Sequence, residues 1–132
     1  MAHSNEQLLR RLYEAQARGD IEAYLSFLSD DVALHVPGRS RIAGDYEGKA
    51  EVRRHFREMT ELSGGTFRTS VDDIAASDQH AVGLISAFAQ KEGREVSLPR
   101  IHVWLVREGE LAEMWVYPRD QHAFDEFWGN RD

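Results

Sequence analysis

Two histidines, His35 and His102, are the side chains of this sequence best suited to proton transfer. The ordinary pKa of histidine lies near 6.5, so at neutral pH its ring can accept or release a proton without much tuning. Asp120 is a third candidate base, although it also stands where a helix needs a cap. Each histidine is equally compatible with a structural role, hydrogen-bonded to a neighbour. The sequence therefore offers two histidines and one carboxylate as candidate catalytic groups.

Arg100 precedes His102 by two residues and is the main candidate for binding an oxygen atom of a ligand. The guanidinium is a forked donor that suits a carboxylate, an enolate or a phenolate. A structural ion pair with one of the 23 acidic residues is the alternative. The other candidates for substrate binding are aromatic, and each is also compatible with an ordinary core position: Tyr13, Tyr46, Trp104, Trp115 and Tyr117.

The stretch from residue 96 to residue 117 predicts two antiparallel strands joined by a turn at Glu108 and Gly109. On the first strand, Arg100 and His102 share a face with apolar residues instead of lying opposite them. That face comprises Val96, Leu98, Arg100, His102, Trp104 and Val106. A few polar groups on an apolar face are typical of a strand that lines a ligand pocket. We therefore expect Arg100 and His102 to point inward, with Trp115 beside them.

The remaining elements follow from capping signals and apolar spacing. Ser4 and Gln7 have the capping-box spacing, and Gly19 is a suitable stop for the helix that they begin. Further helices are expected over residues 21–28 and 49–62 and after Asp120, and further strands over residues 32–36, 67–74 and 80–90, with a loop over residues 38–48. This order of two helices, a strand, a helix and a four-stranded meander predicts an α+β fold, with helices on one side of a curved antiparallel sheet.

Composition excludes several classes of function. The 132 residues fit a single domain, residues 1–132, and a net charge of -7 without a basic stripe argues against nucleic acid. No apolar run approaches the roughly 20 residues that a membrane span needs. The absence of cysteine suits a reducing cytoplasm, and no two histidines have the close spacing of a metal site. We expect a cytoplasmic protein without metal, nucleic-acid or membrane partners.

Five short segments carry a resemblance to a known family. They are DIEA and LSDDV at residues 20–23 and 28–32, GDYEG at 44–48, GEL at 109–111 and EMW at 113–115. Their order and spacing resemble the SnoaL-like branch of the NTF2-like superfamily, which includes ketosteroid isomerase and polyketide cyclases. The resemblance implies a cone-shaped α+β barrel, a curved antiparallel sheet with the N-terminal and middle helices covering it around an apolar pocket, often in a homodimer.

The resemblance leaves the function open, because this fold hosts many chemistries and also binding modules. The isomerases place an aspartate base near the end of the first strand, and this chain has His35 near that position. The hydrolases of the fold pair an arginine with aspartates. In this chain Arg100 is followed two residues on by His102 and not by an acid. One interpretation is a cofactor-independent isomerase, cyclase or lyase that moves a proton next to a carbonyl group of a small apolar molecule. The other is a non-catalytic small-molecule binder or a dimeric assembly module. A homodimer is also expected from an apolar strip on the other face of the strand: Pro99, Ile101, Val103 and Leu105.

Overall fold

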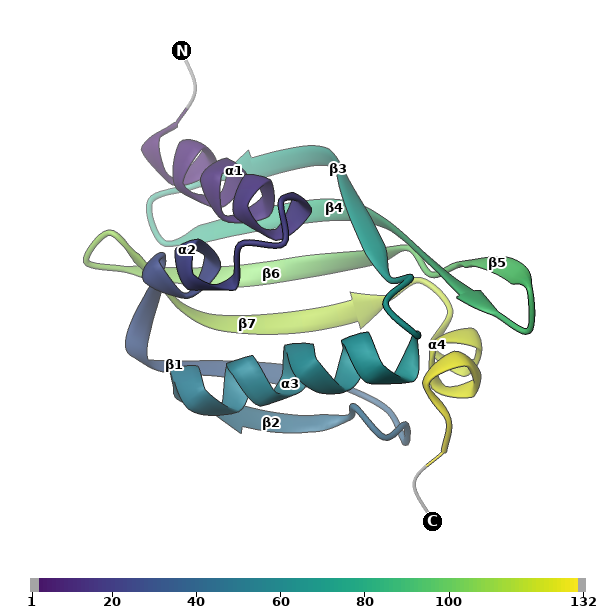
Figure 1. Ribbon diagram of the computed structural model, residues 1–132. Helices are drawn as coiled ribbons and strands as arrows, with labels where there is room; N and C mark the ends of the chain where they lie inside the picture. Colours follow the sequence, from purple (N-terminus) through teal and green to yellow (C-terminus); the bar gives the residue numbers. More distant parts are fainter. Residues whose placement is uncertain (1–2, 131–132) are drawn as a thin grey trace.

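The computed structural model of the protein describes residues 3–130. Within these residues, four helices and seven strands follow one another (Figure 1). Their bounds are α1 Ser4–Ala17, α2 Ile21–Ser26, β1 Leu28–Val36, β2 Gly44–Glu47, α3 Lys49–Leu62, β3 Arg68–Ala76, β4 His80–Lys91, β5 Arg94–Ser97, β6 Arg100–Arg107, β7 Glu110–Pro118 and α4 Gln121–Trp128. The expected α+β fold is confirmed. None of the helices within residues 3–130 is long and apolar enough to span a membrane.

The strands form one curved, unclosed sheet in the order β2-β1-β7-β6-β4-β3, with β5 paired to β4. All neighbours are antiparallel except β1 and β7, which run parallel, with Leu34 opposite Met114. The sheet is therefore mixed, whereas the sequence predicted an antiparallel one. The expected turn at Glu108 and Gly109 is confirmed, and both residues have the positive φ angles of a tight hairpin turn.

Helices α1, α2 and α3 lie on one side of this sheet, as Figure 1 shows. Helix α1 contacts β3 and β4, and α3 contacts β1 and β2. Between the two helices, the inward side chains of β1, β6 and β7 are buried in a single apolar core that includes Leu34, Trp104 and Met114. Because side chains alternate along a strand, the residues between them face away from the helices. The helix-covered side is called the inner face below, and the opposite side the outer face.

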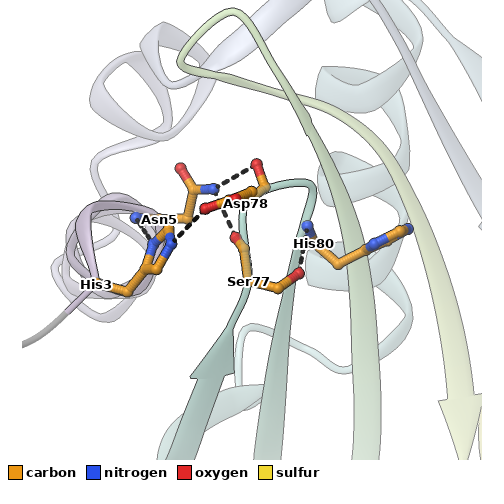
Figure 2. Close-up of polar contacts among 5 residues, drawn as sticks. All are labelled: His3, Asn5, Ser77, Asp78 and His80. Carbon is orange, nitrogen blue, oxygen red and sulfur yellow. Dashed lines mark hydrogen bonds and ion pairs between the residues drawn. The ribbon is translucent and has the colours of Figure 1, made fainter.

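The start of α1 differs from the prediction by one residue. The cap is His3 and not Ser4, since the Nδ1 atom of His3 accepts the backbone N–H of Asn5 at 3.1 Å. Figure 2 shows how the same two residues reach the turn between β3 and β4, where His3 Nε2 lies 3.1 Å from Asp78 Oδ1 and the Asn5 amide donates to Ser77 O at 2.8 Å. The imidazole thus caps the helix and also ties it to a distant turn.

Three strand predictions also require correction. Strand β1 begins at Leu28 rather than at residue 32, and the second helix ends at Ser26. Strand β2 lies inside the predicted loop of residues 38–48, where it pairs with β1. Residues 94–97 form a separate strand, β5, and the chain leaves the sheet at Leu98 and Pro99 before β6 begins. Pro99 has no N–H with which to continue the ladder, which accounts for the break.

Candidate functional site

Strand β6 delivers three of the predicted residues to the inner face. Arg100, His102 and Trp104 alternate with outward residues and are 6%, 7% and 0% exposed. Their partners across the ladder to β7 are Pro118, Val116 and Met114. The expectation that Arg100 and His102 point inward is confirmed, and both line the same internal space.

Two neighbouring hollows, an inner cavity and an entrance groove, lie on the inner face of the sheet and share part of their lining. The inner cavity has a volume of about 30 Å³ and is lined by Arg100, His102 and His55 among apolar side chains. An entrance groove of about 810 Å³ runs between the α1–α2 connection, α3 and the start of β3. The two share six lining residues: Gln16, Tyr24, Phe56, Met59, Phe67 and Thr69. The groove therefore adjoins the inner cavity along these six side chains.

Arg100 is a buried cation without an acidic partner in the part of the chain that the structure describes. Its Nε donates to Leu98 O at 3.2 Å, and its guanidinium carbon lies 5.2 and 5.1 Å from the ring centroids of Phe67 and Phe124. Its Nη2 is buried and has no hydrogen-bond partner within residues 3–130, and Arg100 forms no ion pair there. Burial lowers the pKa of Arg100 to about 10, so the side chain still carries its charge at neutral pH. An unpaired buried charge is unfavourable unless a ligand supplies the missing acceptor.

His102 is held from behind by two aromatic residues. Its Nδ1 lies 2.8 Å from the Tyr13 hydroxyl oxygen, which in turn accepts the indole N–H of Trp104 at 3.1 Å. Burial, and secondarily the neighbouring Arg100 and His55, lower the pKa of His102 to about 3. Burial also raises the pKa of Tyr13, so its phenol keeps its proton. The predicted residues Tyr13 and Trp104 therefore act as a support behind His102.

His55 is a third polar residue of the inner cavity and was not predicted from the sequence. It lies on α3, three residues after Val52 and four before Met59, so it belongs to the buried stripe of that helix. Its Nδ1 has no partner among the described residues, and its ring packs 4.5 Å from that of Tyr46. Burial, followed by Arg100 and Arg54, lowers the pKa of His55 to about 3. A histidine on an apolar helical stripe is the signal that would have identified it.

His35 and Trp115 lie on the outer face, away from the inner cavity. The two rings stack at 5.6 Å, and His35 Nδ1 and Nε2 lie 2.7 Å from Asp45 Oδ1 and 2.6 Å from Glu113 Oε2. Partial burial disfavours the charged ring, but the hydrogen bonds to the two carboxylates outweigh it and raise the pKa of His35. The expectation that Trp115 stands beside Arg100 is wrong, because Trp115 follows the inward Met114 on β7.

The three other predicted residues also lie apart from the inner cavity. Tyr46 is buried beside His55 and donates its hydroxyl to Ile42 O at 2.7 Å. Tyr117 is on the outer face and is 54% exposed. Asp120 caps α4 by accepting the N–H of Ala123 at 3.0 Å. Residues 3–130 contain no group of three histidine, aspartate or glutamate side chains placed to hold a metal ion.

The chemistry available in the inner cavity follows from its lining. It contains one permanent cation, Arg100, two histidines that are neutral at pH 7, and no carboxylate among the described residues. Such a set can bind and polarise an oxygen atom of a ligand. A histidine with a pKa near 3 accepts a proton only weakly, so the lining is better suited to binding than to proton abstraction.

Comparison with known proteins places the chain in a family. The SnoaL-like domain family matches residues 9–114. Uncharacterised proteins of Mycobacterium tuberculosis and Mycobacterium bovis are 24% identical over 122 residues, which is 92% of this chain and 93% of theirs. Among solved structures, Bal32a from a soil-derived mobile gene cassette has a TM-score of 0.89 and 28% identity, covering 96% of this chain and 97% of that one. TerC, co-crystallised with polyporic acid, has a TM-score of 0.85 and 22% identity, covering 95% and 98%.

Proposed function

The chain belongs to the SnoaL-like domain family, and on that premise we propose that the interior of its cone binds a small, largely apolar molecule through an oxygen acceptor received by Arg100. The observation that carries this proposal is the side chain of Arg100, which lines the inner cavity, is 6% exposed and has an Nη2 atom without a hydrogen-bond partner within residues 3–130. Leaving a charge buried without a partner costs on the order of several kcal/mol. A ligand oxygen would recover part of that free energy on binding.

The walls around Arg100 support an apolar ligand body. Phe67 and Phe124 cover the guanidinium, and Met59 and Phe56 continue the apolar surface into the entrance groove. Sites for small molecules usually have this composition, with a few polar groups that fix the orientation of the ligand. The ligand of TerC, a relative in fold, is named polyporic acid, which is consistent with a ligand that carries an acidic oxygen.

The test is a fragment screen by ligand-observed NMR, with small aromatic and aliphatic acids, their amides and ketones of matched size. We expect hits that bind the wild-type protein and lose at least about tenfold in affinity in Arg100→Met, because a hydrogen bond to a charged group is lost. Arg107→Met is the matched control, since it removes an exposed arginine from the other end of the same strand. Hits that bind Arg100→Met as well as wild type would contradict the proposal.

Cofactor-independent proton transfer next to a carbonyl group is the second candidate function. The observation that favours it is the unpartnered Nδ1 of His55, which lines the inner cavity together with Arg100 and His102. Arg100 would stabilise the enolate oxygen while His55 accepts the proton. A ketone from the screen should then exchange its α-hydrogen in D2O in the presence of wild-type protein and not of His55→Gln. Equal exchange in both would leave binding as the only function.

We also propose that the protein forms a homodimer through the outer face. Leu84, Ile101 and Tyr117 are 42%, 41% and 54% exposed and lie opposite one another across β4, β6 and β7, so they form one apolar row. A second copy would cover that row. Sedimentation at about 10 μM should give a dimer for wild type and a monomer for Ile101→Glu. A wild-type monomer would contradict this proposal.

The cytoplasmic location expected from the absence of cysteine stays a prediction.

A further inference from the structure

We infer that the oxygen received in the inner cavity belongs to a carboxylate, because Arg100 and His102 both line the cavity, both have a side-chain nitrogen without a hydrogen-bond partner among the described residues, and Arg100 brings a positive charge that no described residue of the cavity balances. The inference rests on the proposed function and adds the chemical class of the ligand. It also assigns Tyr13 and Trp104 as positioning residues that determine which nitrogen of His102 carries its proton.

The Tyr13 hydroxyl has two polar neighbours, His102 and Trp104. The indole N–H of Trp104 is a donor only, so the Tyr13 oxygen accepts from it. If His102 Nδ1 also donated to that oxygen, the buried O–H of Tyr13 would have no acceptor within residues 3–130, which is unfavourable. Tyr13 therefore donates to His102 Nδ1. The proton of the neutral imidazole then resides on Nε2, the ring nitrogen with no hydrogen-bond partner among the described residues.

Gly83 makes this arrangement possible. It lies opposite His102 on β4, and a Cβ atom at position 83 would come within 2.7 Å of the Tyr13 hydroxyl oxygen and 2.9 Å of its ring. Tyr13 thus reaches His102 directly over the backbone of a glycine. The contact between the α1 tyrosine and the β6 histidine depends on the absence of a side chain at that position.

The lining of the inner cavity carries a positive charge. At neutral pH, His55 and His102 are uncharged and Tyr13 keeps its proton, so Arg100 is the one charged group among the described lining residues of the inner cavity. A neutral carbonyl compound would satisfy the free Nη2 but leave the charge unbalanced. A carboxylate does both, and its two oxygens match the forked geometry of the guanidinium.

The volume of the inner cavity limits which part of a ligand it can hold. The inner cavity has a volume of about 30 Å³, and one water-sized group needs roughly 10–15 Å³. It therefore has room for about two such groups, as the two oxygens of a carboxylate require. The body of the ligand would lie in the entrance groove, against Phe56, Met59 and Phe67. The ligand class is a small organic acid with an apolar body, bound with its carboxylate innermost.

The mouth of the groove supports the same class of ligand. Four arginines line it, together with a single aspartate, Asp20, in a protein whose net charge is -7. Arg53 and Arg68 are paired with Glu22 and Glu95, and Arg18 lies 3.8 Å from Asp20. No ion pair within residues 3–130 involves the fourth, Arg57. Arg57 therefore leaves one positive charge at the mouth of the groove that no described carboxylate pairs with, and such a charge favours the arrival of an anion.

The experiment compares acids with their own amides, using phenylacetate and octanoate against phenylacetamide and octanamide on the full chain by calorimetry at pH 7.5. We expect each acid to bind roughly tenfold or more tightly than its amide, and this ratio to fall towards one in Arg100→Met. The affinity of the acids should be constant from pH 6 to pH 9. Affinity that falls through pH 6.5–7.5 would mean that His102 binds as an imidazolium, and would overturn the assignment of its proton.

The nitrogen-15 NMR spectrum of His102 provides a readout that does not depend on any ligand. We expect a protonated, pyrrole-type signal for Nε2 and an unprotonated, pyridine-type signal for Nδ1. Tyr13→Phe removes the donor to Nδ1 and should average the two signals and weaken acid binding several-fold. Tyr117→Phe is the control, because it removes a tyrosine hydroxyl from the outer face and leaves the lining of the inner cavity and of the groove unchanged.

The outcomes of these experiments distinguish the carboxylate inference from the proposed binding of a ligand oxygen by Arg100. Amides or ketones that bind as tightly as the acids, or a proton found on Nδ1, would overturn the carboxylate inference while binding at Arg100 stands. A screen in which acids, amides and ketones all fail to bind would overturn the proposed function itself. Preferential binding of the acids that is unchanged in Arg100→Met would locate the acid elsewhere and overturn both.

Discussion

His102 and His35 lie on opposite faces of one sheet, opposite adjacent residues of β7, Val116 and Trp115. On the inner face, burial and a guanidinium lower the pKa of His102 to about 3, and its ring is neutral. On the outer face, two carboxylates outweigh partial burial and raise the pKa of His35. Both ring nitrogens of His35 lie within hydrogen-bond distance of a carboxylate oxygen, and the ring can donate to both only as the charged imidazolium. The partners of a histidine, and not its presence, determine what chemistry it can do.

The largest expected difference between the two faces concerns their tryptophans. Trp104 is fully buried and donates to Tyr13, whereas Trp115 is partly exposed and stacks on His35. Trp104→Ala should lower the free energy of unfolding by about 3–5 kcal/mol, the usual cost of truncating a buried aromatic residue. Trp115→Ala should cost less than half as much, as measured by urea denaturation. Equal costs would mean that the outer face is as tightly packed as the inner one, and would remove the contrast.

The second prediction uses the pH dependence of stability. Since the pKa of His102 is about 3 in the folded protein and near 6.5 when unfolded, the unfolded chain binds more protons between these values. The contribution of His102 to stability is therefore complete above pH 6.5 and is lost as the pH falls towards 3. His102→Gln should reduce the slope of stability against pH between pH 4 and 6 by up to about 1.4 kcal/mol per pH unit.

The control for this measurement is His122→Gln, which replaces a histidine on the surface of α4 with 90% of its side chain exposed. That substitution should leave the slope unchanged. A slope that is the same in His102→Gln and in wild type would show that His102 titrates normally in the folded protein. The inner face would then not hold His102 in its neutral form at acidic pH.

The third prediction tests the contact that holds His102 in place. Gly83→Ala adds a methyl group 2.7 Å from the Tyr13 hydroxyl oxygen, and Tyr13 must move away from His102 to admit it. Overpacking of this kind lowers the free energy of unfolding by about 1–3 kcal/mol. The His102 nitrogen signals should average as in Tyr13→Phe. The outward neighbour supplies the comparison, because Val82→Ala changes the outer face and should leave the His102 signals unaltered.

The sequence allowed the inner face to be predicted better than the outer one, for a physical reason. Arg100 and His102 were placed by alternation within a single strand, which is a local property. Alternation also gives the face on which His35 and Trp115 lie, but their contact depends on the parallel pairing of β1 with β7, two strands far apart in the sequence whose register shifts between Leu28 and Ala33. No local pattern reports such a pairing.

His55 was missed for a different reason. The residues used to predict the buried stripe of α3 were apolar, and a histidine between them was passed over although its spacing fits the same stripe. The carboxylates beside His35 were equally inaccessible to sequence reasoning, since Asp45 lies in a strand predicted as a loop and Glu113 on β7. Local patterns gave the direction of most side chains, and long-range pairing determined which of them meet.

The smallest expected effect belongs to His35, and its sign is opposite to that of His102. Because the pKa of His35 is raised in the folded protein, its contribution to stability is fully present below its ordinary value near 6.5 and is lost as the pH rises through the folded value. The ring is 30% exposed and Asp45 is 72% exposed, so the ion pairs are screened and contribute less than about 1 kcal/mol. His35→Gln should therefore destabilise the protein slightly at pH 6 and not at pH 9. High salt should reduce the effect further. A loss of stability that is the same at both pH values would mean that His35 acts by packing on Trp115 and not by its charge.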